Sequence, residues 1–255
     1  FVMPSYRFWE TPFYGIGLMM YDALAGKAGL GATQFLGRAR TLECLPTART
    51  QGLKGGVKYW DGQFDDARLA LALARTAANL GALLVNYCPA KSLVHEAGKV
   101  AGFVCEDSES GRQFTVRARA VVNATGVWVD TLRQMDGEAT GRPVQAIVAP
   151  SQGVHIVVDR EFLPSDHALM VPKTADGRVL FAVPWLGKLI LGTTDTPRHD
   201  IVREPEPFRE EVRFILQESA KYLTRAPREH DIRSIWVGLR PLVKPQDSDG
   251  DNTKK

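Results

Sequence analysis

The chain has 255 residues, with 32 basic and 29 acidic side chains, and 44% of the sequence is hydrophobic. This composition is typical of a globular protein that can form a real hydrophobic core. A net charge of +3 without any block of lysines and arginines argues against a nucleic-acid-binding protein. No apolar run is long enough to span a bilayer, and the three cysteines lack metal-ligand spacing, so we predict no metal site.

The first 90 residues contain one well-marked helix. The aromatic N-terminal part predicts helices at 12–24 and 33–38 and a strand at 57–59. Asp65 is a suitable N-cap for a helix that carries Leu69 and Leu73 on one face and ends at Gly81. An apolar strand at 82–87 should follow, which would make half of a βαβ unit.

Three short strands are then predicted at 90–95, 99–106 and 113–117, as an antiparallel meander. The segment 118–123 is apolar on both faces, which is typical of an interior strand of a parallel sheet. Small residues turn the chain into a helix near 128–135.

After Gly141 the pattern changes to strands at 144–148, 154–158, 169–172, 179–184, 189–193 and 235–239, with a helix at 208–224. We therefore predict an α/β plus α+β fold. Residues 1–141 would be part of an α/β sheet domain with an inserted meander. Residues 142–245 would be a mostly antiparallel sheet domain with a helix over one face, and residues 246–255 a disordered tail.

The usual dinucleotide-binding fingerprint of three glycines is absent. Gly15-Ile16-Gly17 is followed by Met20 where a third glycine is needed, and no convincing strand precedes it. The turn Ala124-Thr125-Gly126 between a strand and a helix is more informative, because small residues there let a flat or anionic ligand approach the backbone. On spacing alone, an ordinary strand–helix turn, which also needs a glycine, is the better explanation.

Five segments in order resemble the FAD-dependent glycerol-3-phosphate dehydrogenases, relatives of the D-amino-acid oxidase and glycine oxidase group. They are Asp65-Asp66-Ala67-Arg68-Leu69, the run from Val121 to Trp128, Gly153-Val154-His155, Gly192-Thr193-Thr194-Asp195 and Gly238-Leu239-Arg240-Pro241. The resemblance covers about residues 40–243. It implies oxidation of glycerol 3-phosphate to dihydroxyacetone phosphate by hydride transfer to FAD. It also implies that residues 1–141 are a partial FAD-binding, Rossmann-like domain and that residues 142–245 are the substrate-binding domain.

The resemblance suggests roles for three residues at the substrate. Arg240 resembles the family's phosphate-binding arginine, and its permanently charged guanidinium suits that role. His155 resembles the active-site histidine, either as the base that takes the hydroxyl proton or as a hydrogen-bond donor. Thr194 would contact the substrate, although buried threonines in strands more often only pack. We expect Arg240 and His155 to face the same cleft.

The resemblance also suggests the flavin contacts. Ala90 and Ser92 would offer backbone to the adenine side, and the run Ala124, Thr125, Gly126 and Trp128 would approach the dinucleotide. The chain begins at Phe1, and we expect the glycine-rich loop upstream of it and a closing strand downstream of Lys255. On its own the chain would then hold FAD weakly and be inactive.

The family implies a cytoplasmic protein at the inner face of the plasma membrane, with electrons passed to quinone, or to oxygen in the oxidase branch. The oligomeric state is open, with a homodimer among the options. Two rival interpretations are an amine oxidase of the glycine or D-amino-acid oxidase type and a truncated module without catalytic activity.

Overall fold

The computed structural model describes residues 1–174 and 177–244. The chain divides into two compact units. The first comprises Phe1–Gly62, Ser151–Pro197 and Val202–Leu239, and the second comprises Gln63–Pro150, Arg198–Ile201 and Arg240–Lys255. The predicted tail at 246–255 lies outside the described residues, and the predicted domains at 1–141 and 142–245 remain predictions.

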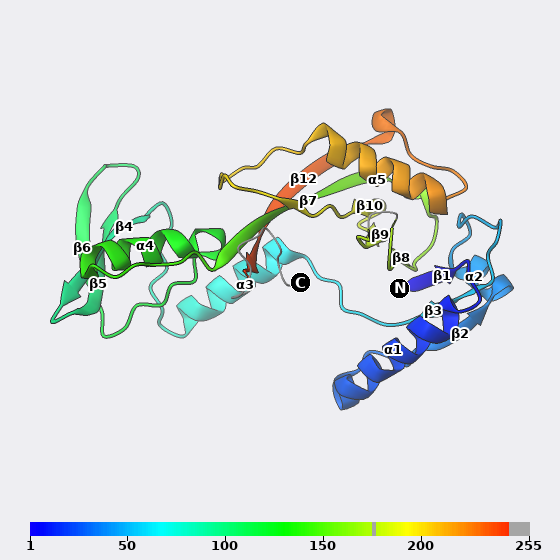
Figure 1. Cartoon of the computed structure of the whole chain (residues 1–255), viewed down its shortest axis with the longest axis horizontal. Coiled ribbons are helices and arrows are strands. Elements are labelled where there is room, and N and C mark those ends of the chain that lie inside the picture. Colours follow the sequence, from blue (N-terminus) through cyan, green and yellow to red (C-terminus); the bar gives the residue numbers. More distant parts are fainter. Residues whose placement is uncertain (175–176, 245–255) are drawn as a thin grey trace. The chain divides into compact units, whose positions relative to one another are not determined.

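The first unit is organised around a mixed sheet. Its strands are β1 (Val2–Ser5), β2 (Gln34–Gly37), β3 (Gly55–Lys58), β7 (Val148–Asp159), β8 (Leu169–Val171), β9 (Leu180–Trp185), β10 (Lys188–Gly192), β11 (Thr196–Pro197) and β12 (Ser234–Val243). Residues 148–150 of β7 and 240–243 of β12 belong to the second unit. Within the described residues these nine strands follow the order β11-β7-β10-β9-β8-β1-β3-β2, and β12 pairs with β7 (Figure 1). Most neighbours are antiparallel, but β1 and β8 run parallel and pair only at Val2 and Leu169.

Helices cover this sheet and close its core. They are α1 (Glu10–Ala25), α2 (Arg38–Cys44) and α5 (Arg209–Tyr222), with short 3-10 turns η1 (Gly26–Ala28), η3 (Arg160–Phe162) and η4 (Glu229–Asp231). Helix α5 packs on β9 and β10 and buries Ile215 completely (Figure 1). The apolar stripe predicted for 208–224 is therefore the face that closes the core.

Two predicted elements of the first unit differ in the structure. The segment predicted as a helix at 33–38 is strand β2, which pairs with β3 along its whole length, and the helix begins only at Arg38. The ring of Phe35 lies so close to Gly15 of α1 that a Cβ there would come within 2.2 Å of it. Sheet pairing and this packing override the local helical preference. The strands predicted at 144–148 and 154–158 are replaced by one strand, β7, which starts at Val148.

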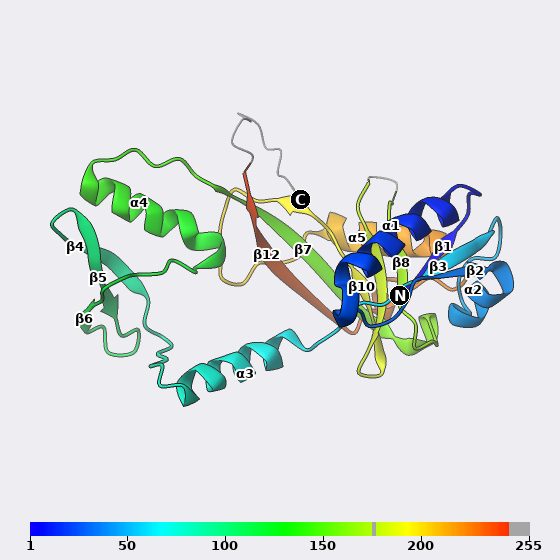
Figure 2. The ribbon, with the colours of Figure 1, turned by 90° about the horizontal axis from the view of Figure 1, so that it is seen from below.

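The second unit contains the predicted meander and two helices. Its elements are α3 (Asp66–Asn79), β4 (Ala90–Glu96), β5 (Lys99–Glu106), β6 (Gln113–Arg117), η2 (Gly126–Trp128) and α4 (Val129–Thr140). Strands β4, β5 and β6 form an antiparallel sheet, and α4 packs beside β4 (Figure 2). Asp65 caps α3 by accepting a 3.0 Å hydrogen bond from the amide of Arg68, and Gly81 follows the helix with a φ of 93°. The predicted cap and terminator are confirmed.

The strands predicted at 82–87 and 118–123 do not form. Both segments are irregular, and their apolar side chains are exposed, to 91% at Leu83 and 85% at Val122. An extended segment becomes a strand only when a neighbour pairs with its amide and carbonyl groups, and no described strand lies alongside either segment. The apolar pattern of each segment is typical of a buried strand, but it does not reveal whether a neighbouring strand is present to pair with it.

Candidate functional site

His155 lies in the middle of β7, on the face of the sheet opposite the core. Its neighbours Val154 and Ile156 are fully buried, and His155 itself is half-buried. Successive residues of a strand point to opposite faces, so the same alternation that anchors β7 in the core directs the imidazole away from it.

Two residues hold the imidazole in place. His155 is paired in register with Gly192 of β10, and a Cβ on Gly192 would lie 2.3 Å from its Cδ2 atom. The indole of Trp236, on β12, stacks on the imidazole with ring centroids 5.4 Å apart and an angle of 18° between the planes. Only glycine leaves room for the ring at position 192, so packing restricts the orientation of the imidazole.

Buried polar groups fix the backbone on either side of His155. Thr194 is completely buried; its hydroxyl accepts a 3.0 Å hydrogen bond from the amide of Val154 and donates one of 3.0 Å to Glu211. The carboxylate of Glu211, on α5, also accepts hydrogen bonds from the side chains of Gln152 at 2.7 Å and Thr196 at 2.7 Å. A carboxylate that is 4% exposed is stable only with several such donors, and here they tie α5 to β7 and to the segment after β10.

The far end of β7 is held by charge. The carboxylate of Asp159 forms ion pairs with Arg233, just before β12, and with Lys188 of β10, each at 2.6 Å. Hydrogen bonds from Arg233 first and then from Lys188 lower the pKa of Asp159 to about 2. Asp159 therefore ties β7 to β10 and to the residue that precedes β12.

The predicted substrate residues belong to different units of the structure. His155 and Thr194 lie in the first unit, and the hydroxyl of Thr194 is used by the Glu211 network. Arg240 is half-buried on β12 and belongs to the second unit. A cleft shared by Arg240 and His155, and contact of Thr194 with substrate, remain predictions.

The turn predicted to approach a dinucleotide is open and well anchored. Asn123 donates a hydrogen bond to the carbonyl of Val129 at 2.9 Å and accepts one from the hydroxyl of Thr125 at 2.8 Å. Ala124 and Gly126 are exposed; Gly126 has a φ of 58°, and a Cβ there would meet nothing within 4 Å. A small, exposed and fixed turn fits a cofactor that approaches the backbone closely.

The other predicted flavin residues also belong to the second unit. Trp128 ends the 3-10 turn η2 and is 39% exposed. Ala90 and Ser92 begin β4, opposite Cys105 and Val104, with an irregular register between the two pairs. A cavity of about 260 Å³, lined by residues of the meander, of α4 and by Asn123, borders the turn.

Sequence reasoning missed three residues of the His155 site. Gly192 was recognised only as part of a motif, whereas Trp236 and Glu211 were not singled out. A glycine in register with a histidine can be recognised only once strand pairing is known. Glu211 carried a weak signal, because an acidic residue three positions after the start of a helical stripe is typical of a helix N-terminus.

The comparisons with known proteins identify the family of the chain. Residues 16–252 match the family described as DAO, FAD dependent oxidoreductase. The chain belongs to this family of FAD-dependent oxidoreductases. It is 42% identical over 250 residues to mitochondrial glycerol-3-phosphate dehydrogenase of Bos taurus, an alignment that covers 95% of this chain and 34% of the bovine protein.

Solved structures of the family show the same fold. A glycerol-3-phosphate dehydrogenase from Bacillus halodurans, complexed with FAD, matches 95% of this chain and 43% of its own length with a TM-score of 0.76 and 33% identity. Glycine oxidase from Bacillus cereus matches 95% of the chain and 60% of its own with a TM-score of 0.68 and 22% identity, which shows a shared fold only. This chain is therefore a homologue of the FAD-dependent glycerol-3-phosphate dehydrogenases, and it spans about a third of the length of the curated relatives that it matches.

Two structural features are absent from the described residues. Within residues 1–174 and 177–244, no helix has the length and apolarity that crossing a bilayer requires. The same residues contain no group of three or more His, Cys, Asp or Glu side chains arranged to hold a metal ion.

Proposed function

We propose that the whole protein oxidises sn-glycerol 3-phosphate to dihydroxyacetone phosphate and passes the electrons, through FAD, to a quinone at a membrane surface. The homology to glycerol-3-phosphate dehydrogenases supports the substrate and the cofactor. The observation on which the proposal depends is the fixed imidazole of His155, held by Gly192 and Trp236 on the face of the sheet away from the core.

His155 acts as the base in this proposal. An imidazole can accept a proton through a ring nitrogen, and packing between an indole and a glycine backbone restricts the orientation of the ring. The hydroxyl on the secondary carbon of the substrate gives its proton to His155 as the carbon–hydrogen bond breaks and the carbonyl forms. Bound FAD supplies the acceptor for the hydride that leaves the carbon.

Arg240 binds the phosphate of the substrate. A guanidinium offers two parallel N–H donors that match phosphate oxygens, and it stays charged at every physiological pH. Arg240 lies on the same strand, β12, as Trp236. The open turn at Ala124–Gly126 would hold part of the dinucleotide, and the chain on its own is expected to bind FAD weakly.

Flavin reduction tests the proposal. In the whole protein without oxygen, glycerol 3-phosphate should bleach the flavin absorbance, whereas glycine and D-amino acids should not. His155→Asn should keep its flavin and reduce it about 100-fold more slowly at saturating substrate, because a general base contributes at least that factor. Arg240→Lys should mainly raise the concentration of glycerol 3-phosphate needed for half-maximal flavin reduction.

Arg213→Gln is the matched control, because Arg213 is an exposed arginine of α5. This variant should leave unchanged both the rate of flavin reduction at saturating substrate and the substrate concentration needed for half of that rate. Bleaching by amino acids alone would favour an amine oxidase and contradict the proposal. Full activity of His155→Asn would remove the base from the mechanism.

A further inference from the structure

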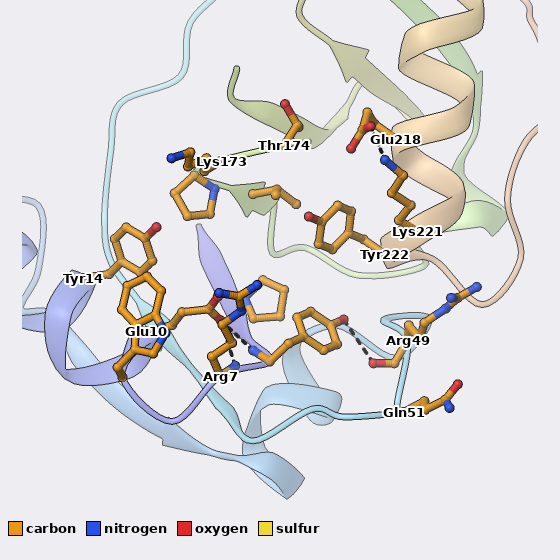
Figure 3. A pocket seen from close by; sticks show the side chains of 15 residues that line it. Arg7, Glu10, Tyr14, Arg49, Gln51, Lys173, Thr174, Glu218, Lys221 and Tyr222 are labelled. Carbon is orange, nitrogen blue, oxygen red and sulfur yellow. Dashed lines mark hydrogen bonds and ion pairs between the residues drawn. The ribbon is translucent and has the colours of Figure 1, made fainter. Parts of the chain in front are cut away.

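A second cavity of the first unit lies where the sheet splits. Strands β1 and β8 pair only at Val2 and Leu169, and beyond that point a cavity of about 590 Å³ opens between them. The start of α1 and the last turn of α5 line its other sides (Figure 3). Its volume is that of a site for a small organic molecule. None of its lining residues was singled out from the sequence, and His155 is not among them.

A buried carboxylate faces this cavity. Glu218 of α5 is 3% exposed, and its Oε1 atom is paired with Lys221. Among the described residues, its Oε2 atom has no hydrogen-bond donor. Figure 3 shows the carboxylate at the cavity wall, between Thr174 and Tyr222. A buried carboxylate oxygen without a donor is costly, so a ligand with a hydroxyl or ammonium group would satisfy it.

The other charged groups favour an anion. The lining has four basic side chains, Arg7, Arg49, Lys173 and Lys221, against two acidic ones, Glu10 and Glu218. Lys221 is paired with Glu218, and Glu10 accepts hydrogen bonds from the amides of Tyr6 and Arg7 at 2.7 and 3.0 Å. Arg7, Arg49 and Lys173 outnumber the one remaining carboxylate, Glu10, and this excess of positive charge is suited to a phosphate.

Tyrosine side chains complete the lining. Burial raises the pKa of Tyr6 to about 12, and burial followed by the charge of Glu218 raises the pKa of Tyr222. Both phenols are therefore neutral at physiological pH and can donate a hydrogen bond. The Tyr6 hydroxyl donates to the carbonyl of Arg49 at 3.1 Å, and Figure 3 shows the Tyr222 hydroxyl directed into the cavity. Their rings offer an apolar wall to the carbon skeleton of a sugar.

We propose that this cavity binds a sugar phosphate, with its phosphate near Arg7 and Lys173 and a hydroxyl donated to the unpaired oxygen of Glu218. The two charge types would recognise the two ends of one molecule. Inorganic phosphate lacks a carbon skeleton that reaches Glu218, and an uncharged sugar lacks the anion. Neither should bind as tightly as the phosphorylated sugar.

Calorimetric titration of the whole protein with glucose 6-phosphate, glucose and inorganic phosphate tests this site. Glucose 6-phosphate should bind at least about tenfold more tightly than the other two, because each end contributes a charge-assisted hydrogen bond. Glu218→Gln and Arg7→Gln should each weaken it by about tenfold. Arg7 is exposed, so its variant reports on binding even if Glu218→Gln disturbs folding.

Controls separate this site from the proposed active site. Glu210→Gln and Arg213→Gln, both exposed on α5, should bind glucose 6-phosphate as the wild type does. His155→Asn should also leave this binding unchanged, whatever its effect on flavin reduction. The proposal would be overturned by equal affinity for inorganic phosphate and glucose 6-phosphate, or by unchanged binding in both Glu218→Gln and Arg7→Gln. It would also be overturned if glucose 6-phosphate gave no heat of binding, as expected when another part of the whole protein fills the cavity.

Discussion

The two units of this chain differ in how much of their apolar surface they bury. The cluster of buried hydrophobic residues lies within the first unit, where strands from distant parts of the sequence pair and α5 covers one face. In the second unit the meander and α4 bury Cys105 and Val127, while Leu83 and Val122 are almost fully exposed. Sequence hydrophobicity is similar in both, so strand pairing rather than composition decides which apolar residues form a core.

The difference also concerns the candidate site. The orientation of His155 depends on three paired strands and on a buried carboxylate, all in the first unit. The turn at Ala124–Gly126 in the second unit depends on the local hydrogen bonds of Asn123. We therefore expect substitutions of the residues that hold His155 in place to lower the free energy of unfolding. Substitutions in the exposed segments of the second unit should change it little.

The largest contrast is expected between two leucines. Leu191 on β10 is completely buried and Leu83 is 91% exposed. Leu191→Ala should lower the free energy of unfolding by about 3 kcal/mol, because it removes buried methyl groups and leaves a cavity. Leu83→Ala should change it by less than about 0.5 kcal/mol. Urea unfolding of the chain followed by circular dichroism measures both, and equal losses would mean that the second unit has a core of its own.

A smaller contrast is expected between neighbouring glutamates of α5. Glu211→Ala removes the carboxylate that accepts hydrogen bonds from Gln152, Thr194 and Thr196, and it should cost about 2 kcal/mol. Glu210→Ala, at an exposed site one residue earlier, should stay within about 0.5 kcal/mol. The same urea titration compares them. A neutral Glu211→Ala would show that the network does not support β7.

The meander, the cap of α3 and the strands around His155 were predictable because local patterns determine them. Asp65 and Gly81 act through their own neighbours in sequence, and alternating burial along β7 follows from residue order. The strand at Gln34–Gly37 was not predictable, because its partner β3 and the fit of Phe35 against Gly15 are tertiary. For the same reason the support of His155 by Gly192 and Trp236 emerged only from the pairing of three strands.

The cavity beside Glu218 shows the same limit. Glu218, Lys221 and Tyr222 share a face of α5 at helical spacing, which a sequence pattern indicates. Their approach to Tyr6 and Arg7 depends on where β1 and β8 separate. A site that combines segments from both ends of the sequence needs the fold before it can be recognised.

The central claim, hydride transfer from the secondary carbon of glycerol 3-phosphate with His155 as the base, can be tested with an isotope. The whole protein is mixed without oxygen with glycerol 3-phosphate that carries either hydrogen or deuterium on its second carbon, and flavin reduction is followed by absorbance. The account predicts that deuterium slows flavin reduction several-fold at saturating substrate. Equal rates with deuterium at the first carbon serve as the control. Equal rates with hydrogen and deuterium on the second carbon, or a flavin that neither form of the substrate reduces, would contradict the account.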